Sequence, residues 1–172
     1  MSVVNEPTNK NFLSPLGFDF RIKKLPTTNF FVTRTTIPGI SLGVVESPTP
    51  FVKLPIPGDK IVFNDLQVTF KIDEDMKNYL EIFNWMMGLG FPEKFDQYAA
   101  LKNKARGSGE GIYSDGILTI LTSAMNPNIE FYFRNVFPYS LTDVDFNTSS
   151  ADVEYLEATV GFRYELFTIN SL

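Results

Sequence analysis

Strict alternation of apolar and polar residues is the feature that most constrains the fold of this chain. Between residues 65 and 73 every second position is apolar and the positions between them are polar; the apolar set is Leu66, Val68, Phe70 and Ile72. A period of two is that of a β-strand with one buried face and one solvated face. The pattern therefore predicts a half-buried strand.

The same kind of pattern recurs along the chain. Near the C-terminus it continues over residues 156–166, which predicts one long strand. Shorter alternating or β-branched and aromatic stretches predict further strands at 18–23, 31–35, 117–122, 129–137 and 143–146. So many short strands with polar outer faces predict a mainly β fold, an antiparallel sandwich or barrel.

One segment has a helical period instead. From Glu74 to Gly88 the apolar residues are three or four positions apart, at Met76, Tyr79, Leu80, Phe83 and Met87. Asp73 is the expected N-cap, and Gly88 is the expected end of this flanking helix. Trp85 and Met86 lie off the apolar stripe. Two interpretations stay open: the helix is buried on two sides, or this edge meets a neighbouring subunit.

Residues 37–59 combine five prolines with several apolar side chains. Proline removes backbone donors, so a regular central strand is not expected here. The segment is also too apolar for a solvated linker. It is expected to be an extended arm that packs either on another subunit or on its own subunit. The candidate inter-subunit contacts are Phe51, Val52, Leu54 and Ile56.

Length and composition narrow the possible functions. The 172 residues fit a single domain, and the chain contains no Cys and no His. These absences exclude a Cys nucleophile, a Ser-His-Asp triad and a metal site built from His. The net charge of −5 argues against nucleic-acid readout, which normally needs a basic surface. No transmembrane helix and no secretory signal are expected, because the sequence shows no apolar run of the required length.

The sequence contains only weak candidates for catalytic or ligand-binding motifs. Glycines at 107, 109 and 111 lie in a Gly-rich loop at 103–111, but they lack the Lys-Ser/Thr ending of a phosphate-binding loop, so a flexible loop after a short helix at 93–101 is expected. Asp143 and Asp145 share a predicted strand face and are the only suggestion of an acid–base pair. No cofactor, metal or catalytic activity is expected. An alternative is a ligand-binding module in which exposed aromatics such as Tyr79, Trp85 or Tyr98 line a site.

Three blocks of the sequence resemble the tail-tube superfamily of contractile-tailed phages. The first joins Phe137-Pro138-Tyr139-Ser140-Leu141 and Asp143–Phe146 to Val160-Gly161-Phe162-Arg163-Tyr164. The second runs from Leu66 to Lys77 and on to Trp85–Gly88, and the third is Thr36-Ile37-Pro38-Gly39-Ile40. Together they cover most of residues 30–167. Within the superfamily the sequence is most similar to the tube terminators (tail completion proteins) of T-even-type phages, and main tube subunits and tube initiators stay open as alternatives.

The resemblance implies a structural protein of the virion tail that assembles in the host cytoplasm. Copies would join edge to edge in a hexameric ring that caps or extends the tail tube, with tube, sheath or neck proteins as partners. DNA would pass through the lumen without sequence-specific binding, and neither a small-molecule substrate nor a membrane is implied. A closed ring removes unpaired sheet edges, and an acidic lumen repels DNA phosphates. Asp143 and Asp145 are the candidate lumen-facing residues.

Overall fold

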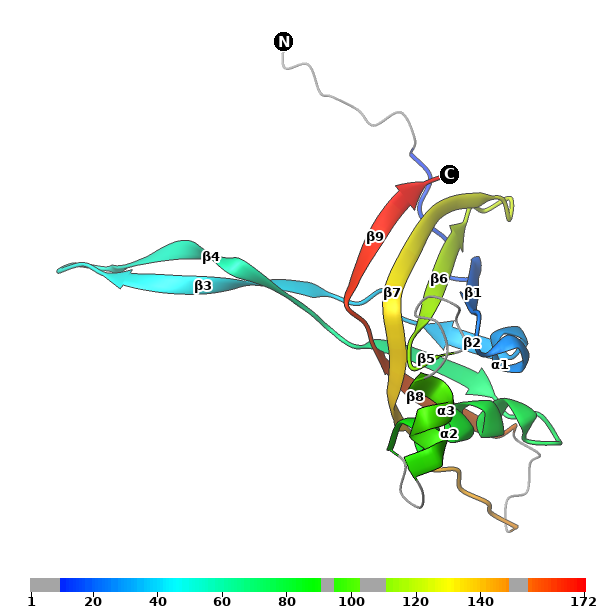
Figure 1. Cartoon of the computed structure of the whole chain (residues 1–172). Coiled ribbons are helices and arrows are strands. Elements are labelled where there is room, and N and C mark those ends of the chain that lie inside the picture. Colours follow the sequence, from blue (N-terminus) through cyan, green and yellow to red (C-terminus); the bar gives the residue numbers. More distant parts are fainter. Residues whose placement is uncertain (1–9, 91–94, 103–110, 149–154) are drawn as a thin grey trace.

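The computed structural model describes residues 10–90, 95–102, 111–148 and 155–172 (Figure 1). Strands dominate these residues, and one long helix flanks them, as the sequence predicts. In chain order the elements are β1 (Phe18–Ile22), α1 (Pro26–Phe30), β2 (Val32–Thr35), β3 (Ile40–Pro48), β4 (Lys53–Phe63), β5 (Leu66–Lys71), α2 (Lys77–Gly90), α3 (Phe95–Lys102), β6 (Ser114–Leu121), β7 (Pro127–Leu141), β8 (Glu157–Arg163) and β9 (Leu166–Ser171).

The main sheet is antiparallel and open. Its strand order is β1-β6-β7-β8-β5-β2, and β9 is added alongside β7. The first half of β7 lies between β6 and β9, whereas its second half pairs with β8. β7 therefore joins two halves of the sheet, and the described strands do not close into a barrel.

A local backbone feature marks the junction within β7. Asn135 has φ 54°, in the left-handed region that Asn tolerates better than most residues. Its backbone N–H donates to Asp115 at 3.2 Å, and the Tyr132 hydroxyl donates to the other oxygen of the same carboxylate at 2.9 Å. The Asn135 side-chain amide donates to Glu165. These contacts hold the strand at the point where its partners change.

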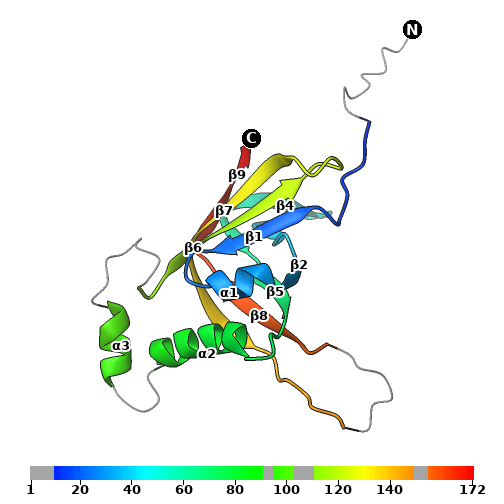
Figure 2. The same cartoon turned by 90° about the vertical axis from the view of Figure 1, so that its right-hand side faces the viewer.

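The alternating pattern is confirmed where the sheet packs on helices. In β5, Leu66, Val68 and Phe70 are buried, and the residues between them are only half-buried. The core lies between this face of the sheet and the helices α1 and α2, which cross it in Figure 2. Burial of one face against helices follows from the period of two in the sequence.

Helix α2 begins three residues later than predicted but uses the predicted cap. The Asp73 carboxylate accepts a hydrogen bond from the Asn78 N–H at 3.1 Å, inside the first turn. Met76, just before the helix, has φ 54°. The chain therefore makes a turn between the capping carboxylate and the first helical residue, a detail that the apolar period does not contain.

The predicted buried stripe of α2 is wrong. Leu80 and Phe83 are 45% and 42% exposed, and the buried residues are Asn78, Ile82, Trp85 and Gly88. Two of these four are not large apolar residues, so a search for apolar spacing misses the face. Asn78 is accommodated because its side-chain amide donates to the Lys71 carbonyl at 2.7 Å.

Helix α2 also caps the short helix α1. No side chain of α1 caps its own N-terminus. Instead the Glu81 carboxylate of α2 accepts hydrogen bonds from the backbone N–H groups of Thr27 at 3.3 Å and Thr28 at 3.2 Å. The Thr28 hydroxyl donates to the same carboxylate at 3.1 Å. A negative charge at a helix N-terminus is favourable, so this contact joins the two helices over the core.

Three further predictions have different outcomes. The long strand expected at 156–166 is two strands, because Glu165 leaves the line of β8 and its N–H donates to the Arg134 carbonyl at 3.0 Å. The strand expected at 143–146 is wrong, since these residues are irregular. The short helix expected at 93–101 is present as α3. Residues 103–110 of the predicted Gly-rich loop lie outside the described residues.

Candidate assembly site

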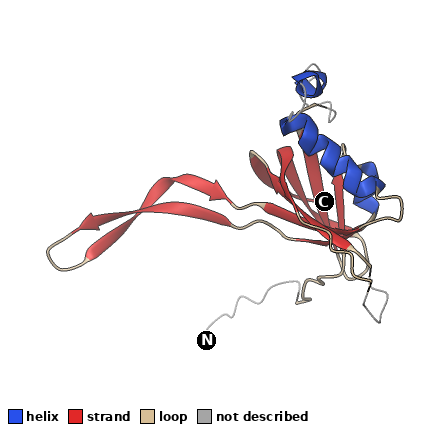
Figure 3. Ribbon diagram, turned by 90° about the horizontal axis from the view of Figure 1, so that it is seen from below, coloured by secondary structure: helices blue, strands red, loops and turns tan. Residues whose placement is uncertain are grey.

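The β3–β4 hairpin projects away from the body of the molecule (Figures 1 and 3). It forms a two-stranded sheet of its own and does not pair with the main sheet in the described residues. The Pro-rich arm predicted at 37–59 is therefore a regular hairpin rather than an irregular extended segment. Its prolines are compatible with this because both strands are edge strands, where an outward-facing proline removes no hydrogen bond of the ladder.

The apolar side chains of the hairpin are exposed. Phe51 at the tip is 98% exposed and Val52 is 64% exposed, while Leu54 and Ile56 on β4 are 52% and 47% exposed. Val45 lies opposite Ile56 on the same face. The interpretation that these residues pack on their own subunit is wrong. Their contact with another subunit stays a prediction.

The two strands approach closely where the hairpin changes register. The register shifts between Leu42 and Val44, opposite the stretch from Pro57 to Ile61. A Cβ atom on Gly58 would lie 2.6 Å from the Gly43 carbonyl oxygen. Only glycine allows this approach, which lets the two strands stay paired through the irregularity.

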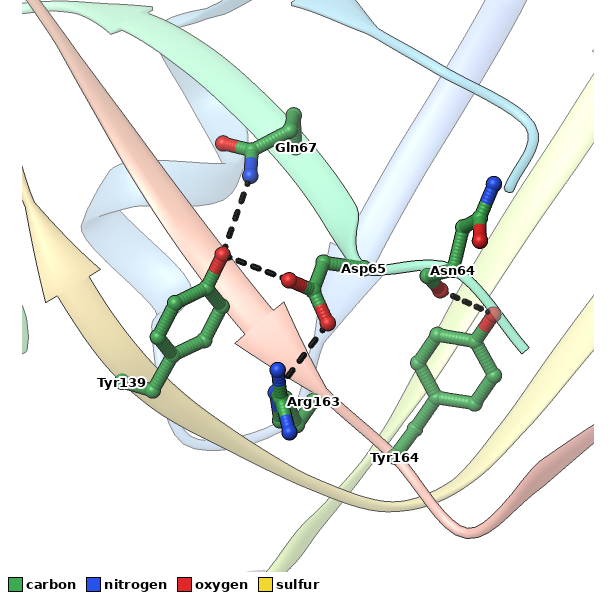
Figure 4. Close-up of polar contacts among 6 residues, drawn as sticks. All are labelled: Asn64, Asp65, Gln67, Tyr139, Arg163 and Tyr164. Carbon is green, nitrogen blue, oxygen red and sulfur yellow. Dashed lines mark hydrogen bonds and ion pairs between the residues drawn. The ribbon is translucent and has the colours of Figure 1, made fainter. Parts of the chain in front are cut away.

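Polar side chains hold the base of the hairpin (Figure 4). Asp65, between β4 and β5, accepts a hydrogen bond from the Tyr139 hydroxyl of β7 at 2.7 Å and forms an ion pair with Arg163 of β8 at 3.1 Å. Gln67 donates to the same hydroxyl at 3.4 Å, and the Arg163 guanidinium lies 5.2 Å from the centre of the Tyr139 ring. We call Asp65, Gln67, Tyr139 and Arg163 the base cluster. It connects three strands at the point where the hairpin leaves the sheet.

A second set of contacts supports the other side of the base. The Tyr164 hydroxyl donates to the Asn64 carbonyl at 2.7 Å, and the Asn64 N–H donates to the Gly39 carbonyl at 2.9 Å. Phe63 packs with Tyr164 and Phe167, with ring centres 6.0 and 5.5 Å apart. Burial, with a smaller effect of the Asp65 charge, raises the pKa of Tyr164 to about 12. The phenol therefore keeps its proton and keeps donating even somewhat above pH 10.

The sequence did not identify the base cluster. Its members lie on the polar sides of alternating strands, where solvated residues are the ordinary expectation. The one clue to the base cluster in the sequence was position. Asp65 and Arg163 lie next to the ends of β5 and β8, which pair in antiparallel register. That register is a long-range property that the local period does not specify.

The remaining candidate residues do not form one site. Trp85 is 2% exposed and its indole N–H donates to the Ile112 carbonyl at 3.1 Å, so its proposed place at a subunit interface or in an exposed ligand site is wrong. Met86, beside it, is half-buried. Asp143 and Asp145 are exposed on an irregular segment after β7 and do not share a strand face.

The described residues offer neither a metal centre nor a membrane span. No group of three or more His, Cys, Asp or Glu side chains in this part of the chain is placed to hold a metal ion. Among the described helices, none has the length and apolar character needed to cross a bilayer.

Solved structures share this fold at low sequence identity. The cap that terminates the tube of the anti-feeding prophage matches with a TM-score of 0.62 and 14% identity, covering 100% of both chains. The sheath–tube complex of an extracellular contractile injection system (PVC) matches with a TM-score of 0.60 and 12% identity, over 95% of this chain and 94% of the other. The six-fold symmetrised baseplate of the anti-feeding prophage matches with a TM-score of 0.59 and 12% identity, over 89% and 90%.

Sequence comparison leads to the same group of proteins. The tail tube terminator protein of Enterobacteria phage T4 is 23% identical over 156 residues, covering 80% of this chain and 85% of the relative. The family model described as phage tail tube protein matches residues 7–170. Since that match spans nearly the whole sequence, the chain belongs to the phage tail tube protein family.

Proposed function

We propose that this protein is a tail tube terminator, a structural and non-enzymatic component that forms a ring at the end of a contractile phage tail tube. The observation that carries the proposal is the β3–β4 hairpin, whose apolar side chains are exposed in the single subunit. Such a surface is costly in water and is typical of a protein that is completed by assembly. The likeness to the T4 terminator and to a tube-terminating cap supports the terminator over other tube proteins.

Open sheet edges support ring formation. In the described structure β1 pairs only with β6, β2 only with β5, and β9 only with β7. Unpaired edges invite pairing with another chain, and a closed ring of identical copies satisfies them without a free end. We take the ring to contain six copies, a number that agrees with the six-fold symmetry of the similar baseplate.

The hairpin is the proposed contact to the next component along the tail. Phe51, Val52, Leu54 and Ile56 would be buried against another copy or against a tube, sheath or neck protein. Each is at least about half exposed in the single subunit, so association would remove most of this apolar area from water.

The placement of Asp143 and Asp145 at the lumen of the ring is also part of the proposal. Asp143 and Asp145 are exposed, and the chain carries a net charge of −5. Acidic side chains facing the pore would repel DNA phosphates and let the duplex pass without sequence-specific binding. The proposed location is the virion tail, with assembly in the host cytoplasm.

Copy number per particle tests the terminator assignment. Quantitative mass spectrometry of purified tails should find about one ring of this protein per particle, and electron microscopy of the purified protein should show rings. Many rings per particle would instead identify the main tube subunit, the alternative that the likeness to a sheath–tube complex favours. A protein that stays monomeric at high concentration and does not bind tail tubes would contradict both assignments.

A further inference from the structure

Strand β9 forms a free margin of the main sheet. β9, β7, β6 and β1 lie side by side in that order, so β9 and β1 bound this half of the sheet (Figure 1). The Leu172 N–H donates to the Asn128 carbonyl at 3.0 Å, and backbone groups alternate in direction along an antiparallel strand. Phe167, Ile169 and Ser171 therefore direct their N–H and C=O groups away from β7. None of these groups has a hydrogen-bond partner within the described residues.

We infer that strand β1 of a second copy adds to this edge of β9 in an antiparallel ladder. The inference rests on the proposed function, because it names the two edges through which a ring of copies would close.

β9 has none of the features that protect an exposed edge. Its sequence Leu-Phe-Thr-Ile-Asn-Ser contains no charged residue and no proline, and its register with β7 is uninterrupted. Proteins block exposed edges with charges, prolines, bulges or very short strands. β2 has four residues, a register shift and the exposed Arg34, while β3 and β4 contain Pro48, Pro55 and Pro57. Among these edges, β9 is the one that is suited to pairing with another chain.

β1 presents a complementary edge. The Leu121 N–H of β6 donates to the Gly17 carbonyl at 2.9 Å, just before β1 begins. By the same alternation, Phe18, Phe20 and Ile22 direct their backbone groups away from β6. The outward N–H and C=O groups of Phe18 and Phe20 have no hydrogen-bond partner in the part of the chain that the structure describes.

Asn29 closes one end of the β1 edge. Its side-chain carbonyl accepts from the Ile22 N–H, and its side-chain amide donates to the Ile22 carbonyl, both at 2.9 Å. A neighbouring strand would make these same two bonds, so Asn29 takes the place of that strand at Ile22. An added strand therefore pairs with Phe18 and Phe20 and ends before Ile22, which limits the register of the ladder.

The strand directions allow the sheet to continue from one copy to the next. β1 and β6, β6 and β7, and β7 and β9 all pair antiparallel, so direction alternates across these four strands and β9 runs opposite to β1. When copies are related by rotation about one axis, β1 of the next copy keeps its direction and lies antiparallel to β9. The contact then repeats around a ring without leaving a free margin. Two β9 strands would instead pair around a two-fold axis and leave both β1 edges open.

The side chains of the two edges also match. Apart from Ser171, the outward-directed residues are apolar: Phe167 and Ile169 on β9, and Phe18 and Phe20 on β1. These four lie on the core face, because their partners on β7 and β6 are buried. Residues that exchange hydrogen bonds in an antiparallel ladder lie opposite each other, so the ladder brings apolar side chains together. Pairing would cover Ile169, which is 59% exposed in the single subunit.

Disulfide trapping tests the ladder, because the chain has no Cys of its own. Asp19→Cys would be co-expressed with either Thr168→Cys or Asn170→Cys and then oxidised, with an affinity tag on one variant to identify heterodimers. These residues lie between the outward-directed ones, where opposing Cβ atoms of a ladder are close enough for a disulfide. At least one of the two pairs should give a covalent heterodimer, and the better pair reports the register.

Asp19→Cys co-expressed with Thr33→Cys is the matched control, since Thr33 is exposed on the edge of β2. Three results would overturn the inference: no heterodimer with either β9 variant, equal yield with the control, or homodimers of the β9 variants in place of heterodimers. The last result would show that β9 pairs with itself.

Proline at position 169 tests the backbone groups separately from the side chain. The Ile169 N–H has no partner in the subunit, so Ile169→Pro removes a hydrogen bond only from the inferred ladder. Sedimentation velocity should show self-association weakened by roughly tenfold or more, because a donor is lost and the ring crowds the added strand. Ile169→Thr keeps the N–H and the branched shape, and it should weaken self-association less. Circular dichroism checks folding, and trapping alone decides if Ile169→Pro does not fold.

The unmodified protein separates failure of this contact from failure of the proposed function. Rings in the unmodified protein, together with absent trapping and equal self-association of Ile169→Pro and Ile169→Thr, would overturn the choice of edges and leave the proposed ring. An unmodified chain that does not self-associate would contradict both.

Discussion

Asp65 shows how single side chains determine the direction of the hairpin. Its carboxylate contacts Tyr139 and Arg163 on two other strands, and the neighbouring Asn64 carbonyl accepts from Tyr164. The ion pair is partly exposed, with the Arg163 side chain 62% and the Asp65 side chain 31% exposed, and it contributes little by itself, about 0–1 kcal/mol. Its role is geometric, because the contacts surround the two residues through which β4 continues into β5.

The close approach at Gly58 gives the first prediction. Gly58→Ala should weaken the hairpin by about 1–3 kcal/mol, because the added methyl group would lie 2.6 Å from the Gly43 carbonyl oxygen. Trypsin should then cut after Lys53 and Lys60 about tenfold faster, with the melting temperature of the body unchanged. Gly43→Ala is the matched control, since its nearest contact would be at 3.8 Å. Equal cleavage rates for both variants would show that the register shift does not need glycine.

Tyr164 gives a prediction on pH. Its folded pKa of about 12 lies above the ordinary tyrosine pKa of 10.0, so the unfolded chain loses the phenolic proton first as pH rises. The stability contributed by this group is complete below pH 10 and is lost as pH rises towards 12. The free energy of unfolding should therefore fall more steeply over this range in the unmodified protein than in Tyr164→Phe. Parallel curves from chemical denaturation would contradict the assignment.

At the scale of elements, α2 connects the main sheet with the short helix α1. Its buried face packs on β8, where the Trp85 and Phe162 ring centres are 6.3 Å apart, and its Glu81 carboxylate caps α1. Beside the helix lies an apolar groove, lined by Tyr79, Phe83, Met86, Met87 and Gly90 of α2 and by Leu141 of β7. One side of α2 therefore packs in the core, and its other side is exposed to solvent.

The two faces of α2 differ in the predicted cost of truncation. Trp85→Ala should lower the free energy of unfolding by about 3–5 kcal/mol, because it removes a buried ring and a hydrogen bond. Leu80→Ala, at a residue that is 45% exposed, should cost about 1 kcal/mol or less. Circular dichroism during urea unfolding measures both without relying on the single tryptophan. Similar costs would mean that the helix packs by the apolar stripe that the sequence predicted.

The local spacing of apolar residues correctly predicted elements whose burial pattern is the same along their whole length. β5 buries every second residue, and its alternation in the sequence is clear. The same reasoning did not find the buried face of α2, since Asn78 and Gly88 belong to it. It also missed the break at Glu165, which depends on a hydrogen bond to β7. Features that depend on a distant partner lie outside what a local pattern records.

At the scale of the whole molecule, the arm and the body are distinct. The apolar and Pro-rich composition of 37–59 identified the arm and its exposed residues, but not its regular pairing or its direction. Pairing depends on Gly58, which lets the two strands approach at the register shift, and direction depends on the base cluster. The sequence therefore predicted the apolar residues of the candidate site, but it did not predict the base cluster that holds the hairpin in place.

Phe51 tests whether the arm works between molecules. Phe51→Asp should leave the melting temperature of the subunit nearly unchanged, because a side chain that is 98% exposed contributes little to folding. Assembly should be strongly impaired, since an unpaired charge at an apolar interface is costly. Phe12→Asp, at a phenylalanine that is 97% exposed outside the hairpin, is the control. Light scattering would report assembly; loss of folding in Phe51→Asp would place the arm in the subunit's own core.

The length of the hairpin amplifies any small change at its base, where Asn64 and the base cluster hold it. For an arm of 11 residues, about 35 Å long, a rotation of about 10° at the base displaces the tip by about 6 Å. Small adjustments at a few hydrogen bonds are thus amplified into a change as large as the width of a side chain. A tilt of this size would move the exposed apolar tip without changing the pairing of the main sheet.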